Sequence, residues 1–76
     1  MIILHTKDRC PTCLRVKNFL DSCGVTYIET GITDDVVAWA KRQGITSAPI
    51  VESDDASLTH GGFNLELLAK LVNKER

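Results

Sequence analysis

Residues 8–17 read DRCPTCLRVK and place two cysteines three positions apart, with Pro11 directly behind the first. Proline is tolerated in the first turn of a helix, because the N–H group that it lacks would have no partner there. The motif therefore predicts a helix that begins at Pro11, with Cys10 as its N-terminal cap, and ends before Gly24. One apolar stripe at helical spacing supports this prediction: Val16, Leu20 and Cys23, with Phe19 beside it.

Four other segments have the composition of strands. Residues 2–6, IILHT, form a short apolar run typical of a buried strand, and residues 25–30, VTYIET, are rich in β-branched and aromatic side chains. Residues 47–53, SAPIVES, predict a third strand with a proline near its start. Residues 54–57, DDAS, predict a turn, after which residues 58–60, LTH, form a short fourth strand.

Two more helices are predicted between and after these strands. The second helix begins at Thr33 and ends before Gly44, with acidic residues in its first turn and basic residues in its last, which both complement the helix dipole. Its expected apolar face consists of Val36, Val37 and Ala40, with Trp39 at the margin. The last helix is capped by Asn64. Its expected apolar stripe consists of Leu65, Leu68 and Val72, with Leu67 and Leu71 alongside.

The order of these elements predicts the topology. A strand–helix–strand start makes the first two strands parallel with a right-handed crossover, and the short turn before the fourth strand makes the last two antiparallel. We therefore predict an α/β fold with a four-stranded mixed sheet (β-α-β-α-β-β-α) flanked by three helices, in a single domain over residues 1–76. A domain of this size buries only about 60% of its unfolded surface, so a large enclosed substrate chamber is not expected.

Charge and hydropathy exclude several classes of protein. Nine Lys and Arg against ten Asp and Glu give a formal charge of −1, so no broad basic face for nucleic acid is expected. No apolar run approaches the roughly 20 residues that cross a bilayer, and the N-terminus lacks the order of a secretory signal. We therefore expect a cytoplasmic monomer with no nucleic-acid or membrane partner. Residues 7–17 differ from this overall balance, because Lys7, Arg9, Arg15 and Lys17 outnumber the single Asp8.

The positions of the two cysteines favour a reactive dithiol. A helix N-terminus carries unpaired N–H groups and a partial positive charge, which favour a thiolate at Cys10, and Lys7 and Arg9 act in the same sense. Cys13 lies one turn further along the helix, with its sulfur less exposed. Cys10 would attack a disulfide of a partner, and Cys13 would then resolve the mixed disulfide. Pro11 stiffens this turn and is expected to tune the redox potential.

Two other roles for the cysteine pair remain open. A passive disulfide is disfavoured, because so short a loop restricts the unfolded chain little. Half of a zinc site would need further ligands, for which the chain offers only the scattered His5, Cys23 and His60. Cys23 would be about 15 Å from Cys13 along a continuous helix, at about 1.5 Å per residue, and is expected to pack in the core. His60 is interpreted as a strand-end residue, and His5 as a strand residue without an assigned function.

Three motifs together resemble the glutaredoxin family of the thioredoxin superfamily: TKDRCPTC after the first strand, SAPIV at the third, and HGGF before the last helix. The resemblance covers nearly the whole chain and implies a thioredoxin fold and thiol–disulfide oxidoreductase activity, with Cys10 and Cys13 as the catalytic pair. It implies further that Pro49 is cis and faces the cysteines, and that the backbone of Ala48 pairs with the substrate as an added strand. The expected substrate-binding residues are Lys7, Arg9, Pro11, Thr12, Ala48, Pro49, Gly61, Gly62 and Phe63, the two glycines allowing close approach of a substrate backbone.

Two branches of the family compete for this sequence. Glutathione-using glutaredoxins usually carry an aromatic residue where this chain has Thr12 and an acidic residue where it has Asn64. The short length, the Ala-Pro of SAPIV and the Gly-Phe of GGF resemble instead the NrdH-redoxins, hydrogen donors of ribonucleotide reductase that are recharged by thioredoxin reductase. That group typically has Trp-Ser-Gly-Phe where residues 60–63 read HGGF, and CPTC is closer to glutaredoxin, so the chain combines features of both, as some small phage redoxins do.

The resemblance also implies the partners. We expect no bound cofactor, reducing equivalents from NADPH through thioredoxin reductase or glutathione, and ribonucleotide reductase as the protein that receives them. A glutathione-dependent glutaredoxin is the first alternative. The second is a non-catalytic carrier that binds an iron–sulfur cluster or zinc, in which Cys10 of two chains would hold the cluster.

Overall fold

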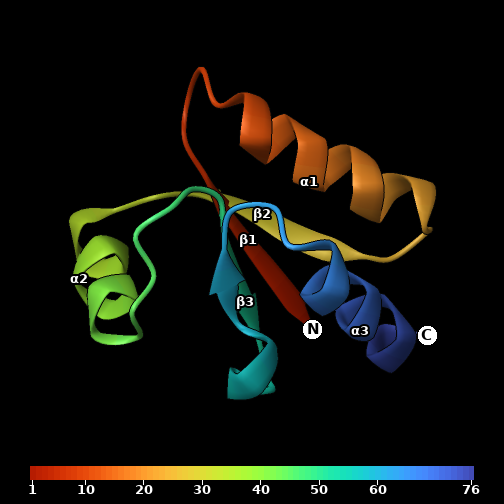
Figure 1. The fold of residues 1–76 in the computed structure, drawn as a ribbon. Helices are drawn as coiled ribbons and strands as arrows, with labels where there is room; N and C mark the ends of the chain where they lie inside the picture. The colour runs from red at the N-terminus through yellow and green to blue at the C-terminus, as the bar shows by residue number, and fades with distance from the viewer.

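Strands and helices follow one another in the predicted order. The computed structural model describes all 76 residues and contains β1 (Ile2–Thr6), α1 (Pro11–Ser22), β2 (Tyr27–Gly31), α2 (Asp34–Arg42), β3 (Ile50–Ser53), β4 (His60–Gly61) and α3 (Leu65–Glu75). The sheet has the order β2-β1-β3-β4, in which β1 is parallel to β2 and antiparallel to β3, and β4 is antiparallel to β3. The helices α1 and α3 lie on one side of the sheet and α2 on the other (Figure 1). The predicted thioredoxin fold is thus confirmed.

The sheet is shorter than predicted at its second and third strands. β2 begins at Tyr27, two residues later than expected, and β3 begins at Ile50 instead of residue 47. Proline has no N–H group to donate to a sheet, so Pro49 marks the point before which residues 45–49 run as a loop. The peptide bond between Ala48 and Pro49 is cis, as the resemblance implied.

The predicted fourth strand is present, but it lies at His60–Gly61 and not at residues 58–60. Residues Ala56–Leu58 form one turn of 3₁₀ helix, and only His60–Gly61 pair with β3. The carboxylate of Asp55 accepts hydrogen bonds from the backbone N–H and the hydroxyl of Ser57, at 3.0 and 2.6 Å. Side-chain bonds of this kind compete with strand pairing, which explains the difference.

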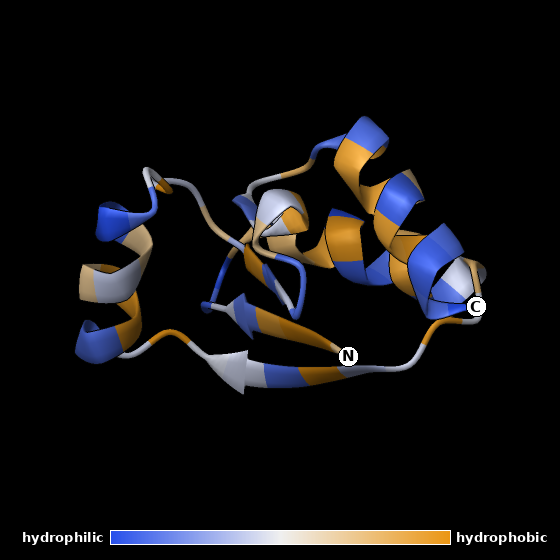
Figure 2. Cartoon of the chain, turned by 90° about the horizontal axis from the view of Figure 1, so that it is seen from below, coloured by the Kyte–Doolittle hydropathy of each residue, from blue (hydrophilic) through white to orange (hydrophobic).

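The larger core lies between the sheet and the helices α1 and α3. Its buried residues are Ile2, Leu4, Val16, Leu20, Val51, Leu58, Leu68, Leu71 and Val72, and Phe19 and Cys23 pack against them. Figure 2 shows the apolar residues that recur along both helices. The predicted stripes on α1 and α3 are therefore confirmed, except that Leu65 is 58% exposed and lies outside the core.

A smaller core holds α2 against the opposite face of the sheet. It consists of Ala40, Ile45 and Ile50, with Ile32, Val36 and Trp39 packed around them. Adjacent residues of a strand point to opposite faces, so Ile50 enters this core and Val51 the larger one. Val37 was predicted for the same face but is 36% exposed and lines a cavity instead.

The ends of the helices follow the sequence signals. The side chains of Cys10, Thr33 and Asn64 each accept a hydrogen bond from a backbone N–H three residues later, at 3.1, 3.3 and 3.1 Å. Gly24 and Gly44 follow α1 and α2 with φ of 70° and 78°, a conformation that favours glycine. None of the helices combines the length and the apolar character needed to cross a membrane.

Candidate active site

The cysteine pair lies where β1 ends and α1 begins. The four residues from Lys7 to Cys10 connect the two elements. Arg9, which precedes the cysteine, has a φ of 54°, which is uncommon for a residue with a side chain. This conformation turns the chain from the strand into the helix and places Cys10 at the N-terminus of α1.

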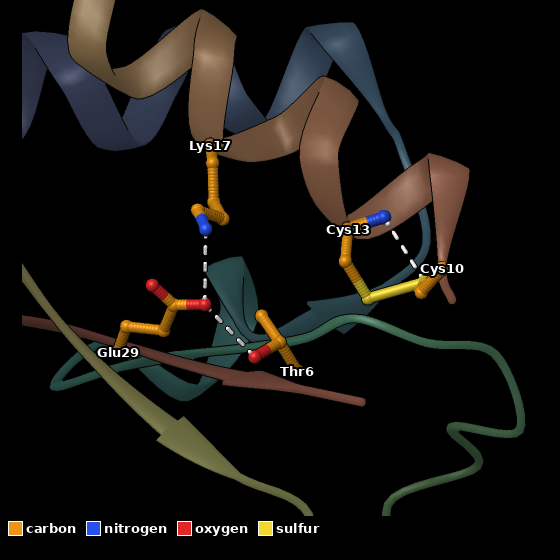
Figure 3. The surroundings of a disulfide bond; sticks show 5 residues. All are labelled: Thr6, Cys10, Cys13, Lys17 and Glu29. Atoms are coloured by element: carbon orange, nitrogen blue, oxygen red, sulfur yellow. Dashed lines mark hydrogen bonds and ion pairs between the residues drawn. A yellow bond between two sulfur atoms is a disulfide. The ribbon is translucent and has the colours of Figure 1, made fainter. Parts of the chain in front are cut away.

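Cys10 and Cys13 form a disulfide in this structure, with their Cα atoms 5.2 Å apart. The sulfur of Cys10 also accepts a hydrogen bond from the backbone N–H of Cys13, with a nitrogen–sulfur distance of 3.1 Å (Figure 3). Cys13 is 4% exposed, whereas Cys10 is half-buried. An incoming molecule therefore reaches the sulfur of Cys10 first.

Fewer free positive charges surround the cysteines than residues 7–17 predicted. The ammonium group of Lys17 lies 3.2 Å from the carboxylate of Glu29 on β2, which also accepts a hydrogen bond from the Thr6 hydroxyl at 3.0 Å (Figure 3). Lys7 and Arg9 form no ion pair. The positive charge next to Cys10 thus comes from the turn before α1, with Lys17 neutralised.

An aromatic contact joins α1 to the loop before α3. The guanidinium carbon of Arg15 lies 4.0 Å from the centroid of the Phe63 ring, and Phe63 meets Phe19 edge-on at 6.1 Å between centroids. A cation above an aromatic face is attracted to it. Arg15 and Phe63 therefore fix the loop that contains the glycine pair beside the first turns of α1.

The glycine pair packs against the loop that contains Pro49. The N–H group of Gly62 donates to the carbonyl of Pro49 at 2.8 Å, and Gly62 has a φ of 72°. A Cβ atom added to Gly61 would lie 2.6 Å from Cγ2 of Ile45 and 2.7 Å from the carbonyl oxygen of Ser47. The packing of the chain itself therefore requires glycine at position 61. The resemblance to the family had given a different reason for this glycine, the close approach of a substrate backbone.

A cavity of about 240 Å³ opens beside the same loop. Six apolar residues line it: Ile32, Val37, Ala40, Ile45, Ala48 and Ile50. Its polar lining consists of Lys7, Lys41, Thr46 and Ser47. Lys41 was predicted only to complement the dipole of α2. Its spacing of four residues from Val37 puts both on one face of the helix, but this spacing alone does not show that the face borders a cavity.

The two histidines are buried, and each has one hydrogen-bond partner. Nε2 of His5 lies 2.8 Å from a carboxylate oxygen of Glu52, and Nδ1 of His60 donates to the carbonyl of Leu58 at 2.8 Å. His60 lies in β4, as predicted, and its Nε2 atom is buried without a hydrogen-bond partner. No group of three or more His, Cys, Asp and Glu side chains is arranged to hold a metal ion.

Comparison with known proteins agrees with this architecture. The family model described as Glutaredoxin matches residues 2–55, well over half of the chain. A protein of Clostridium pasteurianum, described as an uncharacterized glutaredoxin-like 8.6 kDa protein in the rubredoxin operon, is 23% identical over 77 residues. That alignment covers 97% of this chain and 100% of the relative. With its fold, its cysteine pair and this match taken together, the chain belongs to the glutaredoxin family, which implies thiol–disulfide redox chemistry.

Proposed function

We propose that the protein reduces disulfides of other proteins with the dithiol form of Cys10 and Cys13. The observation that carries this proposal is the placement of the Cys10 sulfur at the N-terminal cap of α1, where it accepts the N–H group of Cys13. A hydrogen-bond donor and the positive end of the helix dipole both stabilise a thiolate more than a thiol. Cys10 is therefore the attacking residue, and the buried Cys13 is the resolving residue.

The reaction has two exchange steps. The thiolate of Cys10 attacks one sulfur of the partner's disulfide, which forms a mixed disulfide and releases the other partner sulfur as a thiolate that takes up a proton. Cys13, once deprotonated, attacks the sulfur of Cys10 and displaces the second partner sulfur. Two electrons pass from the dithiol to the partner, and the protein is left as the Cys10–Cys13 disulfide.

The loop before β3 supplies the proposed binding edge. Ala48 lies outside the strands, and neither its N–H group nor its carbonyl takes part in the hydrogen bonds of loops and turns. Free backbone groups of this kind can pair with an extended segment of a partner. In this proposal Lys7 stabilises the thiolate, Thr12 lines the groove, and Pro49 ends the protein's own pairing so that Ala48 is left for the guest.

We favour ribonucleotide reductase as the protein substrate and thioredoxin reductase as the source of electrons. Thr12 provides no aromatic ring of the kind that glutathione-using relatives carry between their cysteines. Asn64 carries no negative charge, and its side-chain oxygen already accepts the N–H group of Leu67 as the cap of α3. Both residues count against glutathione, although CPTC itself resembles the glutathione-using branch.

The decisive experiment follows NADPH oxidation with a protein disulfide, first with thioredoxin reductase and then with glutathione and glutathione reductase. We expect turnover with the first system. Turnover with the second alone would replace this reading by a glutathione-dependent glutaredoxin, and turnover with neither would exclude the enzyme. A visible chromophore in freshly purified protein would favour the iron–sulfur carrier instead.

Substitution of the cysteines tests the order of the two steps. Cys13→Ser should accumulate a mixed disulfide with the protein substrate, because the resolving thiol is missing, whereas Cys10→Ser should form none. Cys23→Ser is the matched control, since Cys23 is the one cysteine outside the disulfide, and it should leave turnover unchanged. Mass spectrometry of the trapped species identifies the cysteine that is bonded to the substrate. A mixed disulfide on Cys13 in the Cys10→Ser variant would contradict the assignment of Cys10 as the attacking residue.

A further inference from the structure

We propose that the cavity beside the Ala48 loop admits one apolar side chain of the partner polypeptide, and that Lys41 at this cavity selects an acidic residue next to it. The inference rests on the proposed function and names the kind of polypeptide that the same site prefers. It adds a binding subsite on α2, on the far side of the sheet from α1.

The position of the cavity relative to Ala48 is the first support. Ala48 lines the cavity and also carries the backbone groups that are free to pair with a guest strand. Residues directly opposite one another in paired strands point to the same face. A strand paired with Ala48 therefore passes the mouth of the cavity with one side chain directed toward it.

The size and lining of the cavity define that side chain. Its volume of about 240 Å³ is smaller than the roughly 300–1,000 Å³ of typical small-molecule sites. Six of its ten lining residues are apolar, and Val37 is partly exposed to solvent within it. An apolar side chain of the size of leucine or phenylalanine removes this surface from water, which is favourable in proportion to the area covered.

The distribution of lysine partners is the second support. The chain has five lysines. The three that lie away from the cavity are each paired with a carboxylate: Lys17 with Glu29, Lys70 with Glu66, and Lys74 with Asp55. The two that line the cavity, Lys7 and Lys41, have none. An acidic residue of the partner complements these two unpaired charges. Lys7 is close to the cysteines in sequence and has a role in stabilising the thiolate, so Lys41 is the lysine that can affect the choice of substrate without affecting the thiolate.

The dipole of α2 offers a different explanation for Lys41, namely that its charge only stabilises the helix. Arg42 provides the control that distinguishes this explanation from a role in substrate binding. Lys41 and Arg42 both lie in the last turn of α2, both are exposed, and both complement the negative end of the helix. Arg42 does not line the cavity. A charge reversal at either position therefore has the same effect on the helix, and only Lys41 should affect the choice of substrate.

The test uses reduced protein, prepared with dithiothreitol and then desalted, in single-turnover reactions with three synthetic peptides. Each peptide has the same disulfide and a leucine beside it, followed by glutamate, glutamine or lysine. We expect the wild type to reduce the glutamate peptide about fivefold faster than the lysine peptide at low salt, which corresponds to about 1 kcal/mol. Lys41→Glu should abolish this ratio and Arg42→Glu should retain it, and 0.5 M salt should reduce it in the wild type and in Arg42→Glu.

A second arm tests the apolar part of the subsite. Replacing leucine of the peptide by serine should slow the wild type, and Val37→Trp, which fills the cavity, should remove the difference between the two peptides. Leu65→Trp is the volume control, because Leu65 is exposed on α3 outside the cavity. Equal leucine-to-serine ratios in Val37→Trp and Leu65→Trp would show that the cavity holds no substrate side chain.

The outcomes distinguish this inference from the function on which it rests. If the reduced wild type reacts with none of the peptides, the proposed function itself fails. If it reduces all of them at one rate, or if Lys41→Glu and Arg42→Glu give the same ratio, only the subsite on α2 is excluded. If Lys41→Glu loses the helical circular dichroism of the wild type, Lys41→Gln is measured in its place. Because this variant has no charge at position 41, its ratio of rates for the glutamate and lysine peptides should be close to one.

Discussion

Gly61→Ala tests the packing of β4 against the loop that leads to Pro49. The added Cβ would lie 2.7 Å from the carbonyl oxygen of Ser47, which is 0.7 Å short of the 3.4 Å at which ordinary contacts begin. Overpacking of this kind costs about 1–3 kcal/mol, and the smaller entropy of the unfolded alanine chain offsets about 0.4–1 kcal/mol of it. We expect the variant to be destabilised by about 1–2 kcal/mol, and its melting temperature to fall by about 4–8 °C per kcal/mol.

Gly31→Ala is the matched control for this prediction. Nothing lies within 4 Å of a Cβ at Gly31, and its φ is not in the left-handed region, so the substitution should be neutral or slightly stabilising. Urea unfolding of the oxidised proteins, followed by the fluorescence of Trp39, the one tryptophan, gives both free energies. Equal midpoints for Gly61→Ala and Gly31→Ala would refute the argument from close packing.

Three further predictions concern titration and the cysteine turn. Burial, and then the hydrogen bond to Asp21, raise the pKa of Tyr27 to about 12, so absorbance titration of this one tyrosine in the folded protein should show a midpoint near 12. The stability that the protonated Tyr27 contributes should be lost as pH rises from 10 to 12. Asp21→Asn should lower the midpoint only in part, because burial remains. The hydroxyl and then the N–H group of Ser57 hold the pKa of Asp55 below its ordinary value of 3.8. Asp55→Asn should therefore destabilise the protein at pH 7, and this difference in urea midpoints should disappear as the pH falls through the pKa of Asp55 and its carboxylate is protonated. Pro11→Ala should shift the potential of the cysteine pair in a redox titration against glutathione without abolishing exchange, and an unchanged potential would count against a tuning role for Pro11.

The elements that depend on neighbouring residues could be predicted from the sequence. The cap at Cys10, the proline behind it and the glycine after α1 act within one or two turns of helix, and their residue types define the conformation directly. The parallel start of the sheet followed in the same way from connection rules. The last strand was predicted to start at residue 58 and starts at His60, because three residues are too few for an alternating pattern to compete with the hydrogen bonds of Asp55.

Features that join distant parts of the chain could not be predicted. Lys17 appeared free because its partner, Glu29, is brought to it only by the pairing of β1 with β2. The requirement for glycine at Gly61 depends on a loop sixteen residues earlier in the chain. Lys41 had a sufficient local explanation in the helix dipole, so the sequence offered no reason to place it at a cavity.

The division of the apolar residues into a core of nine and a core of three has a consequence for motion. Segments with few buried contacts open at a smaller cost in free energy than the rest of a domain. The amide hydrogens of α2 should therefore exchange with solvent before those of α1, which is held by the fully buried Val16 and Leu20. We therefore expect the half of the domain that contains the two cysteines to be rigid, and the half around α2, where we propose that the partner polypeptide binds, to move more easily.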